Sequence, residues 1–326
     1  MMSKTRFIIP FILMFALLLA GCGGDSADDV QRPVEKENTE ICINTNVTKM
    51  QTRATTIDND EALRSYDLRI DAFYNNTNTA YLSDTRLHYS SVWKFWDGTS
   101  QLHYYWPIEG SKYGSGSDYT SLDFVGYCPF VAPYIYTTTY DFSTGVSFSC
   151  NLSNYMTNSS QASMPEYLIA ILKGQTYADQ VEHSGVPLEF KHPFALIKFV
   201  IAAGSGTHVQ VNSISISGLN TNATCTYNGS TISWDSHSGS TAMSQTGLNL
   251  KYGTSSTATD YFMVIPKNYG SMTLTVNGTW DDWSAVTKNI STDISINWEP
   301  GYIYTYNLTV TKYALTVKTD KYTEQW

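Results

Sequence analysis

The sequence predicts an all-β protein made of β-sandwiches. Short segments in which apolar and polar residues alternate recur along the chain, and this period of two is that of half-buried strands. Clusters of Gly, Asn, Asp, Ser and Pro separate these segments at short intervals, which is typical of sandwich folds. Only 15% of the 326 residues are charged, whereas 24 are tyrosines. Strands favour aromatic and β-branched residues, so the composition agrees with the pattern.

The clearest strand signal lies at residues 66–74, where Leu68, Ile70 and Ala72 share one face and charged residues share the other. The remaining strand signals are shorter and extend to the C-terminus. They predict strands at 86–96, 102–106, 122–129, 146–150, 167–172, 186–199, 224–227, 231–234, 261–265, 272–276, 290–298, 302–310 and 315–319.

Two local features interrupt the strand pattern. In residues 209–216 the alternation changes phase near Asn212, which predicts a bulge or a bend in the strand. Residues 58–65 are the one helical candidate, with Asp58 as the expected N-cap.

The N-terminus has the parts of a bacterial lipoprotein leader. Lys4 and Arg6 precede an apolar segment at 7–20, which is too short to span a bilayer but has the length of a signal-peptide core. The sequence Leu-Ala-Gly-Cys at 19–22 is a small-residue cleavage box that ends in cysteine. We therefore predict that Cys22 becomes the lipidated N-terminus and anchors the chain in the cell envelope. The alternative is a secretory leader that happens to contain a cysteine.

A polar and acidic tether follows Cys22, and its composition cannot bury a core. Within the tether Ile41, Ile43 and Val47 alternate with other residues, which is compatible with a first strand. The chain after its leader is long enough for two domains of ordinary size, with a boundary expected near Gly185. The predicted segments are a signal peptide at 1–21, a tether at 22–53, an N-terminal sandwich at 54–185 and a C-terminal sandwich at 186–326.

Charge and cysteine content narrow the function classes. A formal net charge of −9 without a basic patch argues against nucleic acid as a partner. Besides Cys22 the chain has Cys42, Cys128, Cys150 and Cys225, whose spacing fits no zinc template. Two interpretations stay open for these four: buried free thiols, or one disulfide that the fold does not require.

No catalytic motif stands out in the sequence. His192 lies in an apolar strand, so a hydrogen-bonded core histidine is expected rather than a ligand or a base. Residues 58–61 begin like a calcium loop but lack its later glycine and glutamate, so a solvated turn is expected. Asp281 and Asp282 lie between two tryptophans, where a packed hairpin tip is favoured over a sugar site. The sequence therefore predicts a protein that is not an enzyme and uses neither metal nor cofactor.

Seven short motifs occur in a fixed order along the chain. They are Leu-Ala-Gly-Cys at 19–22, Thr-Arg-Ala-Thr at 52–55, Tyr-Trp-Pro at 105–107, Phe-Val-Gly-Tyr-Cys-Pro at 124–129, the segment 188–199 with its Phe-Lys-His, Phe-Met-Val-Ile-Pro at 262–266 and Trp-Glu-Pro-Gly-Tyr-Ile-Tyr-Thr-Tyr at 298–306. As a set they resemble the fimbrillins of Bacteroidetes type V pili, over nearly the whole chain after the leader. The acidic stretch behind Cys22 also resembles the surface-export signal of Bacteroidetes lipoproteins.

The resemblance implies a fold and a mode of assembly. It implies two tandem transthyretin-like, Greek-key β-sandwich domains. It also implies an outer-membrane lipoprotein from which an arginine-specific protease removes the first strand. A strand of another fimbrial subunit then fills the exposed groove at the cell surface. An open strand edge is otherwise a liability, and head-to-tail strand addition makes a filament rather than a closed ring.

For this chain the resemblance places the processing site between Arg53 and Ala54. It assigns the donor strand to the C-terminal segment, where apolar and polar residues alternate. The alternative is an ordinary edge strand of the chain's own sandwich. The expected donor-strand residues are Leu315, Val317, Tyr322 and Trp326.

Two other function classes stay open. One is a monomeric surface lipoprotein that keeps its N-terminal strand and binds glycan or host protein through exposed Trp and Tyr. The other is a hydrolase whose site is assembled from distant residues. Processing at Arg53 separates the fimbrial subunit from the monomeric binder, and a deep cleft lined by carboxylates would favour the hydrolase.

Overall fold

The structure is a computed structural model that describes residues 39–47, 57, 59–107, 120–161, 164–250, 257–280 and 286–322. Strands dominate these residues, so the prediction of an all-β protein is confirmed. The helices in the described ranges are short, and none has the length and hydrophobicity needed to cross a membrane. The predicted leader and the lipidation site at Cys22 lie outside the described residues.

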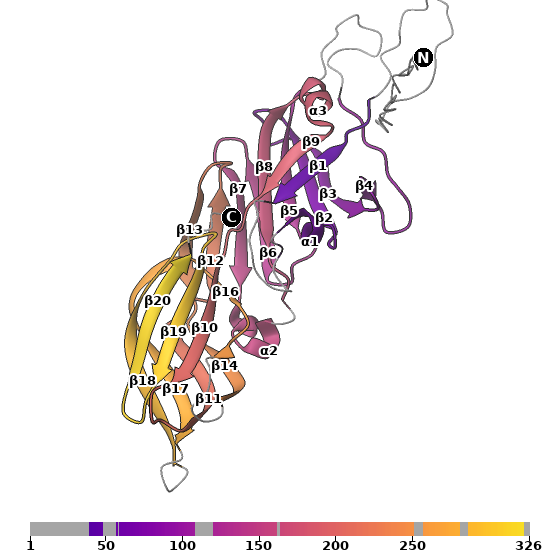
Figure 1. The fold of residues 1–326 in the computed structure, drawn as a ribbon. Coiled ribbons are helices and arrows are strands. Elements are labelled where there is room, and N and C mark those ends of the chain that lie inside the picture. The colour runs from indigo at the N-terminus through magenta and orange to yellow at the C-terminus, as the bar shows by residue number, and fades with distance from the viewer. Residues whose placement is uncertain are drawn as a thin grey trace, which may run out of the picture. The chain divides into compact units, whose positions relative to one another are not determined.

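Five antiparallel strands form a sheet in the N-terminal half, in the order β4-β3-β2-β5-β8. Its centre is buried because Leu68, Ile70 and Ala72 of β2 have no exposed surface, as their alternation predicts. A separate pair, β1 (Ile43–Val47) and β9 (Val186–Phe190), runs in parallel (Figure 1). The bounds of the five-stranded sheet are β2 Leu68–Tyr74, β3 Ala80–Tyr89, β4 Trp93–Trp96, β5 Leu122–Cys128 and β8 Leu168–Gln175.

A second antiparallel sheet takes strands from both halves of the chain, in the order β13-β12-β7-β6. β7 and β12 join the halves, with Cys225 opposite Phe148 and Ala223 opposite Cys150. The predicted domains 54–185 and 186–326 therefore share this sheet, and the division near Gly185 stays a prediction. The bounds are β6 Ile135–Asp141, β7 Gly145–Asn151, β12 Asn222–Tyr227 and β13 Ile232–Ser238.

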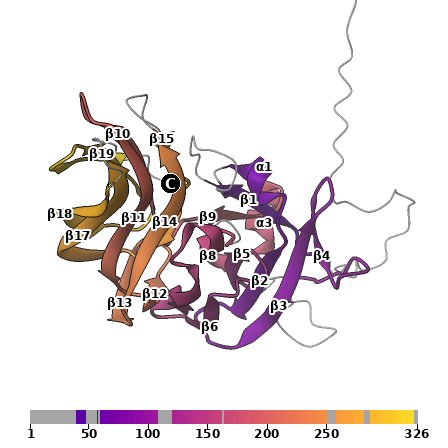
Figure 2. The same cartoon turned by 90° about the horizontal axis from the view of Figure 1, so that it is seen from below.

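Two further sheets form the C-terminal half and face each other in both views (Figures 1 and 2). One has the order β15-β10-β19-β20, with β16 also paired to β10, and its β10 and β19 are parallel. The other has the antiparallel order β14-β11-β17-β18. The bounds are β10 Ala195–Ala203, β11 Val209–Leu219, β14 Thr241–Leu250, β15 Thr257–Ala258, β16 Phe262–Val264, β17 Lys267–Trp280, β18 Val286–Trp298, β19 Ile303–Val310 and β20 Leu315–Tyr322.

The apolar side chains form two clusters, and β5 contributes to both. Phe124 and Cys128 of β5 enter the smaller cluster, which also contains the inward residues of β1 and β9. Val125 and Tyr127 enter the larger cluster, which continues through the C-terminal sheets. Successive side chains of a strand point to opposite faces, so one strand can serve both cores. This explains why all seven residues of β5 are buried.

The helices differ from the prediction. The predicted helix at 58–65 is shorter, α1 at Asp60–Leu63, and its N-cap is Asn59, whose side chain accepts a hydrogen bond from the Ala62 amide. Asp58 as the N-cap is therefore wrong. Two further helices, α2 (Asn158–Gln161) and α3 (Tyr177–His183), were not predicted. A capping box of Thr176 and Asp179 marks the start of α3, and this signal is visible in the sequence.

The strand predictions have several errors and one clear success. The predicted strands 86–96 and 186–199 are each two strands, β3 with β4 and β9 with β10, and β6 and β14 were not predicted. Residues 102–106 are not a strand, because their pairing with the tether is one isolated bridge between Tyr105 and Glu40. At this bridge the Ile41 amide donates to the Tyr104 carbonyl, and the Trp106 amide donates to the Thr39 carbonyl. The predicted irregularity near Asn212 is confirmed, since the register of β11 shifts between Val211 and Ser213 against both neighbouring strands.

Candidate functional site

β1 lies in a slot beside β9, and its alternate side chains point into the smaller apolar cluster. Ile41, Ile43, Thr45 and Val47 are only 2–7% exposed, whereas Asn44 and Asn46 between them are exposed. The tether thus does contain a first strand, with the alternation that Ile41, Ile43 and Val47 indicate. Burying the three aliphatic side chains is worth roughly 1.5–3 kcal/mol each, so β1 is an integral part of this core.

Gln180 of α3 holds the start of β1. Its Oε1 accepts hydrogen bonds from the Cys42 amide and from Trp106 Nε1, both at 2.9 Å, and its Nε2 donates to the Glu40 carbonyl at 2.9 Å. Next to it the Val186 amide of β9 donates to the Cys42 carbonyl at 2.8 Å. One buried amide side chain thereby satisfies three polar groups that would otherwise lack partners.

The other end of β1 is fixed by two side chains. Asp60 Oδ1 accepts a hydrogen bond from the Val47 amide at 2.8 Å. Trp93 Nε1 donates to Thr45 Oγ1, also at 2.8 Å. The second bond explains how a threonine occupies an inward position, because its hydroxyl is paired inside the slot.

A second anchor lies just after the tether. Ile57 is 1% exposed, and its amide donates to Glu166 Oε2 at 3.0 Å. The other oxygen of Glu166 lies 2.7 Å from Nδ1 of His192, whose side chain is 1% exposed. The expectation of a hydrogen-bonded core histidine at His192 is therefore confirmed. Arg53 and Ala54 lie outside the described residues, in the segment between the buried residues Val47 and Ile57.

β20 occupies the edge of its sheet and pairs with β19 from Leu315↔Val310 to Tyr322↔Ile303. Leu315 is 6% exposed and Val317 is partly buried against the larger cluster, whereas Thr316 and Lys318 are exposed. The predicted inward face of this segment is thus confirmed. In this structure β20 is an edge strand of its own sheet, and its role as a donor stays a prediction. The Tyr322 side chain and Trp326 lie outside what the structure describes.

Comparison with known proteins agrees with this arrangement. The family model described as Fimbrillin-like matches residues 44–326. The chain belongs to the fimbrillin-like family. The match begins inside β1, at Asn44, and continues to the last residue, so most of β1 and the whole terminal strand lie within the matched residues.

Solved structures resemble this fimbrillin-like chain in fold. A fimbrial protein from Bacteroides vulgatus has a TM-score of 0.61 at 16% sequence identity, over 87% of this chain and 99% of that one. A putative cell adhesion protein from Bacteroides ovatus has a TM-score of 0.55 at 12% identity, over 87% of this chain and 96% of that one. No curated protein matches the sequence. At these identities the likeness shows a shared fold.

The cysteines of this fimbrillin-like chain fit the first of the two open interpretations. Cys128, Cys150 and Cys225 are buried free thiols, and Cys42 is partly exposed beside β1. Burial raises the pKa of Cys150 to about 12, and burial also raises the pKa of Cys128 and of Cys225 well above the usual range. These three thiols therefore stay protonated at neutral pH.

The remaining sequence candidates have structural roles where they are described. Asn59 caps α1 and Asp60 holds β1, while no three His, Cys, Asp or Glu residues of the described ranges gather as metal ligands. Trp280 is buried and donates to the Thr311 carbonyl, as a packed hairpin requires. Asp281, Asp282 and Trp283 lie outside the described residues.

Sequence reasoning missed the side chains that hold β1. Gln180, Asp60 and Trp93 come from segments that have no regular spacing relative to the tether. The capping box before α3 could have located the helix that carries Gln180, but no sequence signal points its amide toward β1.

Proposed function

We propose that this protein is a structural subunit of a cell-surface fimbria, delivered to the outer membrane as a lipoprotein and polymerised by donor-strand exchange. The observation that carries the proposal is β1: a buried strand that lies on the N-terminal side of the predicted cleavage site. Cleavage between Arg53 and Ala54 by an arginine-specific protease would disconnect β1 from the rest of the chain. The fold of the chain and its membership of the fimbrillin-like family support this proposal.

Loss of β1 would open a site that favours another strand. The departing strand leaves the edge of β9 without its pairing partner and uncovers the pockets of Ile41, Ile43 and Val47. Gln180 and Asp60 would lose the backbone groups that they bind, and unpaired buried polar groups cost about 1–3 kcal/mol each. A strand from a second subunit restores both kinds of contact, which is the physical basis of strand addition.

β20 has the side-chain order of the first three inward positions of this slot. The inward residues are Ile41 before β1 and Ile43, Thr45 and Val47 within it, and in β20 the residues of one face are Leu315, Val317 and Thr319, followed by Lys321. We place the β20 residues in the slot in that order, parallel to β9. Thr319 would then take the place of Thr45 as the acceptor for Trp93 Nε1.

The test uses the full chain and an arginine-specific protease. We expect fragments that begin at Ala54 to appear by N-terminal sequencing, followed by filaments in electron micrographs. Arg53→Ala should block both. Arg64→Ala is the matched control, because Arg64 lies at the end of α1 with its guanidinium over the Tyr89 ring and should resist cleavage in the folded chain.

The same experiment separates the main alternative. A monomeric lipoprotein that binds glycan or host protein would keep β1, so the protein recovered from the cell surface would begin at Cys22. Normal filaments from Arg53→Ala, with β1 still attached, would contradict the processing model.

A further inference from the structure

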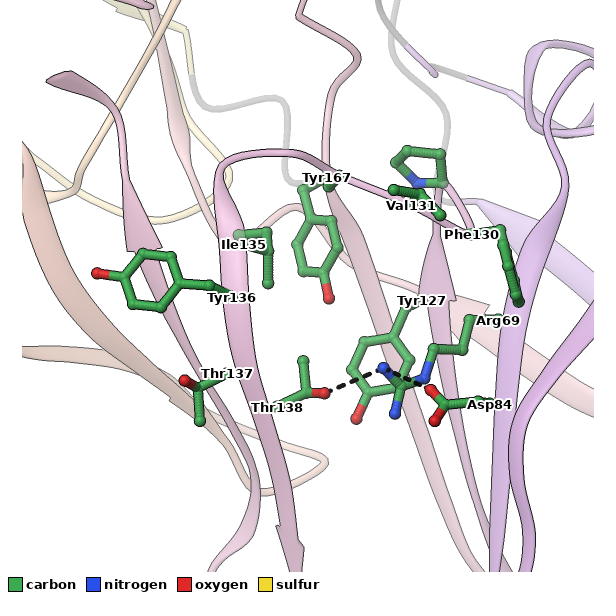
Figure 3. A pocket seen from close by; sticks show the side chains of 12 residues that line it. Arg69, Asp84, Tyr127, Phe130, Val131, Ile135, Tyr136, Thr137, Thr138 and Tyr167 are labelled. Carbon is green, nitrogen blue, oxygen red and sulfur yellow. Dashed lines mark hydrogen bonds and ion pairs between the residues drawn. The ribbon is translucent and has the colours of Figure 1, made fainter. Parts of the chain in front are cut away.

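A cavity of 320 Å³ lies beside β6, on the side opposite to β7, and is closed on its other side by residues of β2, β3 and β5 (Figure 3). It has no part in the slot of β1 or in the edge formed by β20. Its size is at the lower end of small-molecule sites, which measure about 300–1,000 Å³.

Two tyrosines line the interior of this cavity. Tyr127 of β5 is 2% exposed and Tyr167, just before β8, is 3% exposed, with ring centroids 6.3 Å apart. Neither phenol oxygen has a hydrogen-bond partner among the residues that the structure describes. Figure 3 shows both rings between β6 and Arg69, with the Tyr167 hydroxyl pointing toward Tyr127.

Other buried tyrosines of the chain do have partners. The Tyr134 hydroxyl donates to the Pro165 carbonyl at 2.5 Å, and the Tyr306 hydroxyl accepts from Trp298 Nε1 at 2.9 Å. Buried phenols normally find such a partner. The Tyr127 and Tyr167 oxygens instead open on one cavity, where both are available to a ligand with hydrogen-bonding groups. Burial raises the pKa of Tyr127 and of Tyr167, so both hydroxyls can donate as well as accept.

The charges around the cavity disfavour an anionic ligand. The one cation that lines it, among the described residues, is Arg69, which binds Asp71 through Nε and Nη2 and Asp84 through Nη1 at 3.0 Å. Its Nη1 also donates to Thr138 Oγ1 at 3.1 Å. Two carboxylates thus balance one guanidinium. The Asp84 side chain is 72% exposed, so a negatively charged group would meet repulsion there.

Much of the remaining lining is apolar. Phe130, Ile135 and the 67% exposed Val131 border the cavity together with Tyr127 and Tyr167. Such walls suit a ligand that presents C–H faces as well as hydroxyl groups. A sugar ring has both, and its hydroxyls can pair with the two phenols.

We propose that this cavity binds a neutral saccharide, with the Tyr127 and Tyr167 hydroxyls as its buried hydrogen-bonding groups. The subunit would then bind a sugar at this site in addition to its contacts with other subunits. It is independent of strand exchange, because its lining belongs to the folded monomer.

The test measures binding of simple sugars to the full chain, kept in a detergent that has no sugar headgroup. The probes are the methyl glycosides of glucose, galactose, mannose, fucose and N-acetylglucosamine, observed by saturation-transfer NMR and titrated for affinity. Glucuronate and glucosamine provide the same ring size with a negative and a positive charge. At least one neutral glycoside should bind. Glucuronate should bind at least tenfold more weakly than that neutral glycoside.

The decisive variant is the double substitution Tyr127→Phe and Tyr167→Phe. It removes two hydroxyls that make no hydrogen bond within the described protein, so thermal stability should stay the same while affinity falls about tenfold or more. Tyr313→Phe is the control, because Tyr313 is 83% exposed at the turn between β19 and β20. The Tyr313→Phe variant should bind the neutral glycoside with the same affinity as the parent chain.

Three results would overturn the proposal. The first is that no neutral glycoside binds. The second is that the double variant binds as well as the parent chain. The third is that glucosamine binds more tightly than every neutral probe, which would indicate a site for cations. Because the measurement uses unprocessed monomer, a negative result leaves filament formation untouched, and a failure to polymerise leaves the sugar result valid.

Discussion

β1 and β20 are both short strands near a chain terminus, but the fold holds them in different ways. β1 has four inward side chains at 2–7% exposure, and polar side chains from α3, β4 and α1 bind its backbone or its threonine. β20 has one partner strand and one fully inward side chain, Leu315. The difference teaches that β20 can detach at moderate cost, whereas β1 stays in its slot until the tether is cut.

The largest effect should come from removing each strand in turn. A chain that begins at Ala54 loses the burial of Ile41, Ile43 and Val47, which is roughly 5–9 kcal/mol at 1.5–3 kcal/mol each. A chain that ends at Tyr313 loses Leu315 and part of Val317, roughly 2–4 kcal/mol on the same scale. Urea unfolding of both truncated chains measures the free energies of unfolding. Equal losses would break the comparison.

A peptide can sharpen this result. A synthetic peptide of residues 312–326 should stabilise the chain that begins at Ala54, because it can fill the empty slot. It should leave the full chain unchanged, since β1 occupies the slot there. Stabilisation of both chains to the same extent would place the peptide elsewhere on the molecule.

Single side-chain truncations should give the next largest effect. Ile43→Ala in the full chain should cost about 2–5 kcal/mol, the range for buried aliphatic residues, with Leu315→Ala near the lower end because β20 is an edge strand. In processed filaments the order should reverse: Ile43 is gone, while Leu315 would fill the neighbouring slot. Denaturant unfolding checks the first ranking, and filament yield checks the second. The same ranking in both measurements would contradict a donor role for β20.

The polar clamp on β1 should have a smaller effect. Gln180→Met leaves the Cys42 amide, the Glu40 carbonyl and Trp106 Nε1 without their partner, so we expect a loss of about 2–3 kcal/mol and faster hydrogen exchange at Cys42. Gln175→Met is the matched control, because that amide donates to the Lys173 carbonyl at an exposed position. It should change stability by less than about 0.5 kcal/mol. Similar losses in the two variants would show that Gln180 does not hold β1.

The smallest effect should come from one hydroxyl of β20. Thr319→Val keeps the shape and the strand preference, and it removes the acceptor that we place opposite Trp93 in the neighbouring subunit. The full chain should keep its stability, whereas affinity of the 312–326 peptide for the empty slot should fall about fivefold, equivalent to about 1 kcal/mol. Thr316→Val lies on the opposite face and should have no effect on affinity. If Thr316→Val weakens the peptide more than Thr319→Val, the register is wrong.

The sequence by itself determined where most of the strands lie and which face several of them bury. Leu68, Ile70 and Ala72 of β2, the inward residues of β1, and Leu315 with Val317 in β20 all follow the period of two, because that period is a property of the extended backbone. The register shift after Val211 appeared in the sequence for the same reason. β6 and β14 escaped prediction, since their Thr, Ser and Tyr residues give no strong apolar alternation.

Only the tertiary structure decided which strands pair and which polar groups meet. The parallel pairs β1–β9 and β10–β19, and the pairing of β7 with β12 across the predicted boundary, join residues far apart in the sequence. Every residue type except proline offers the same backbone donor and acceptor, so the local sequence of a strand does not determine which strand it pairs with. The Gln180 clamp and the Tyr127–Tyr167 cavity depend in the same way on side chains that come together only after those long-range pairings have formed.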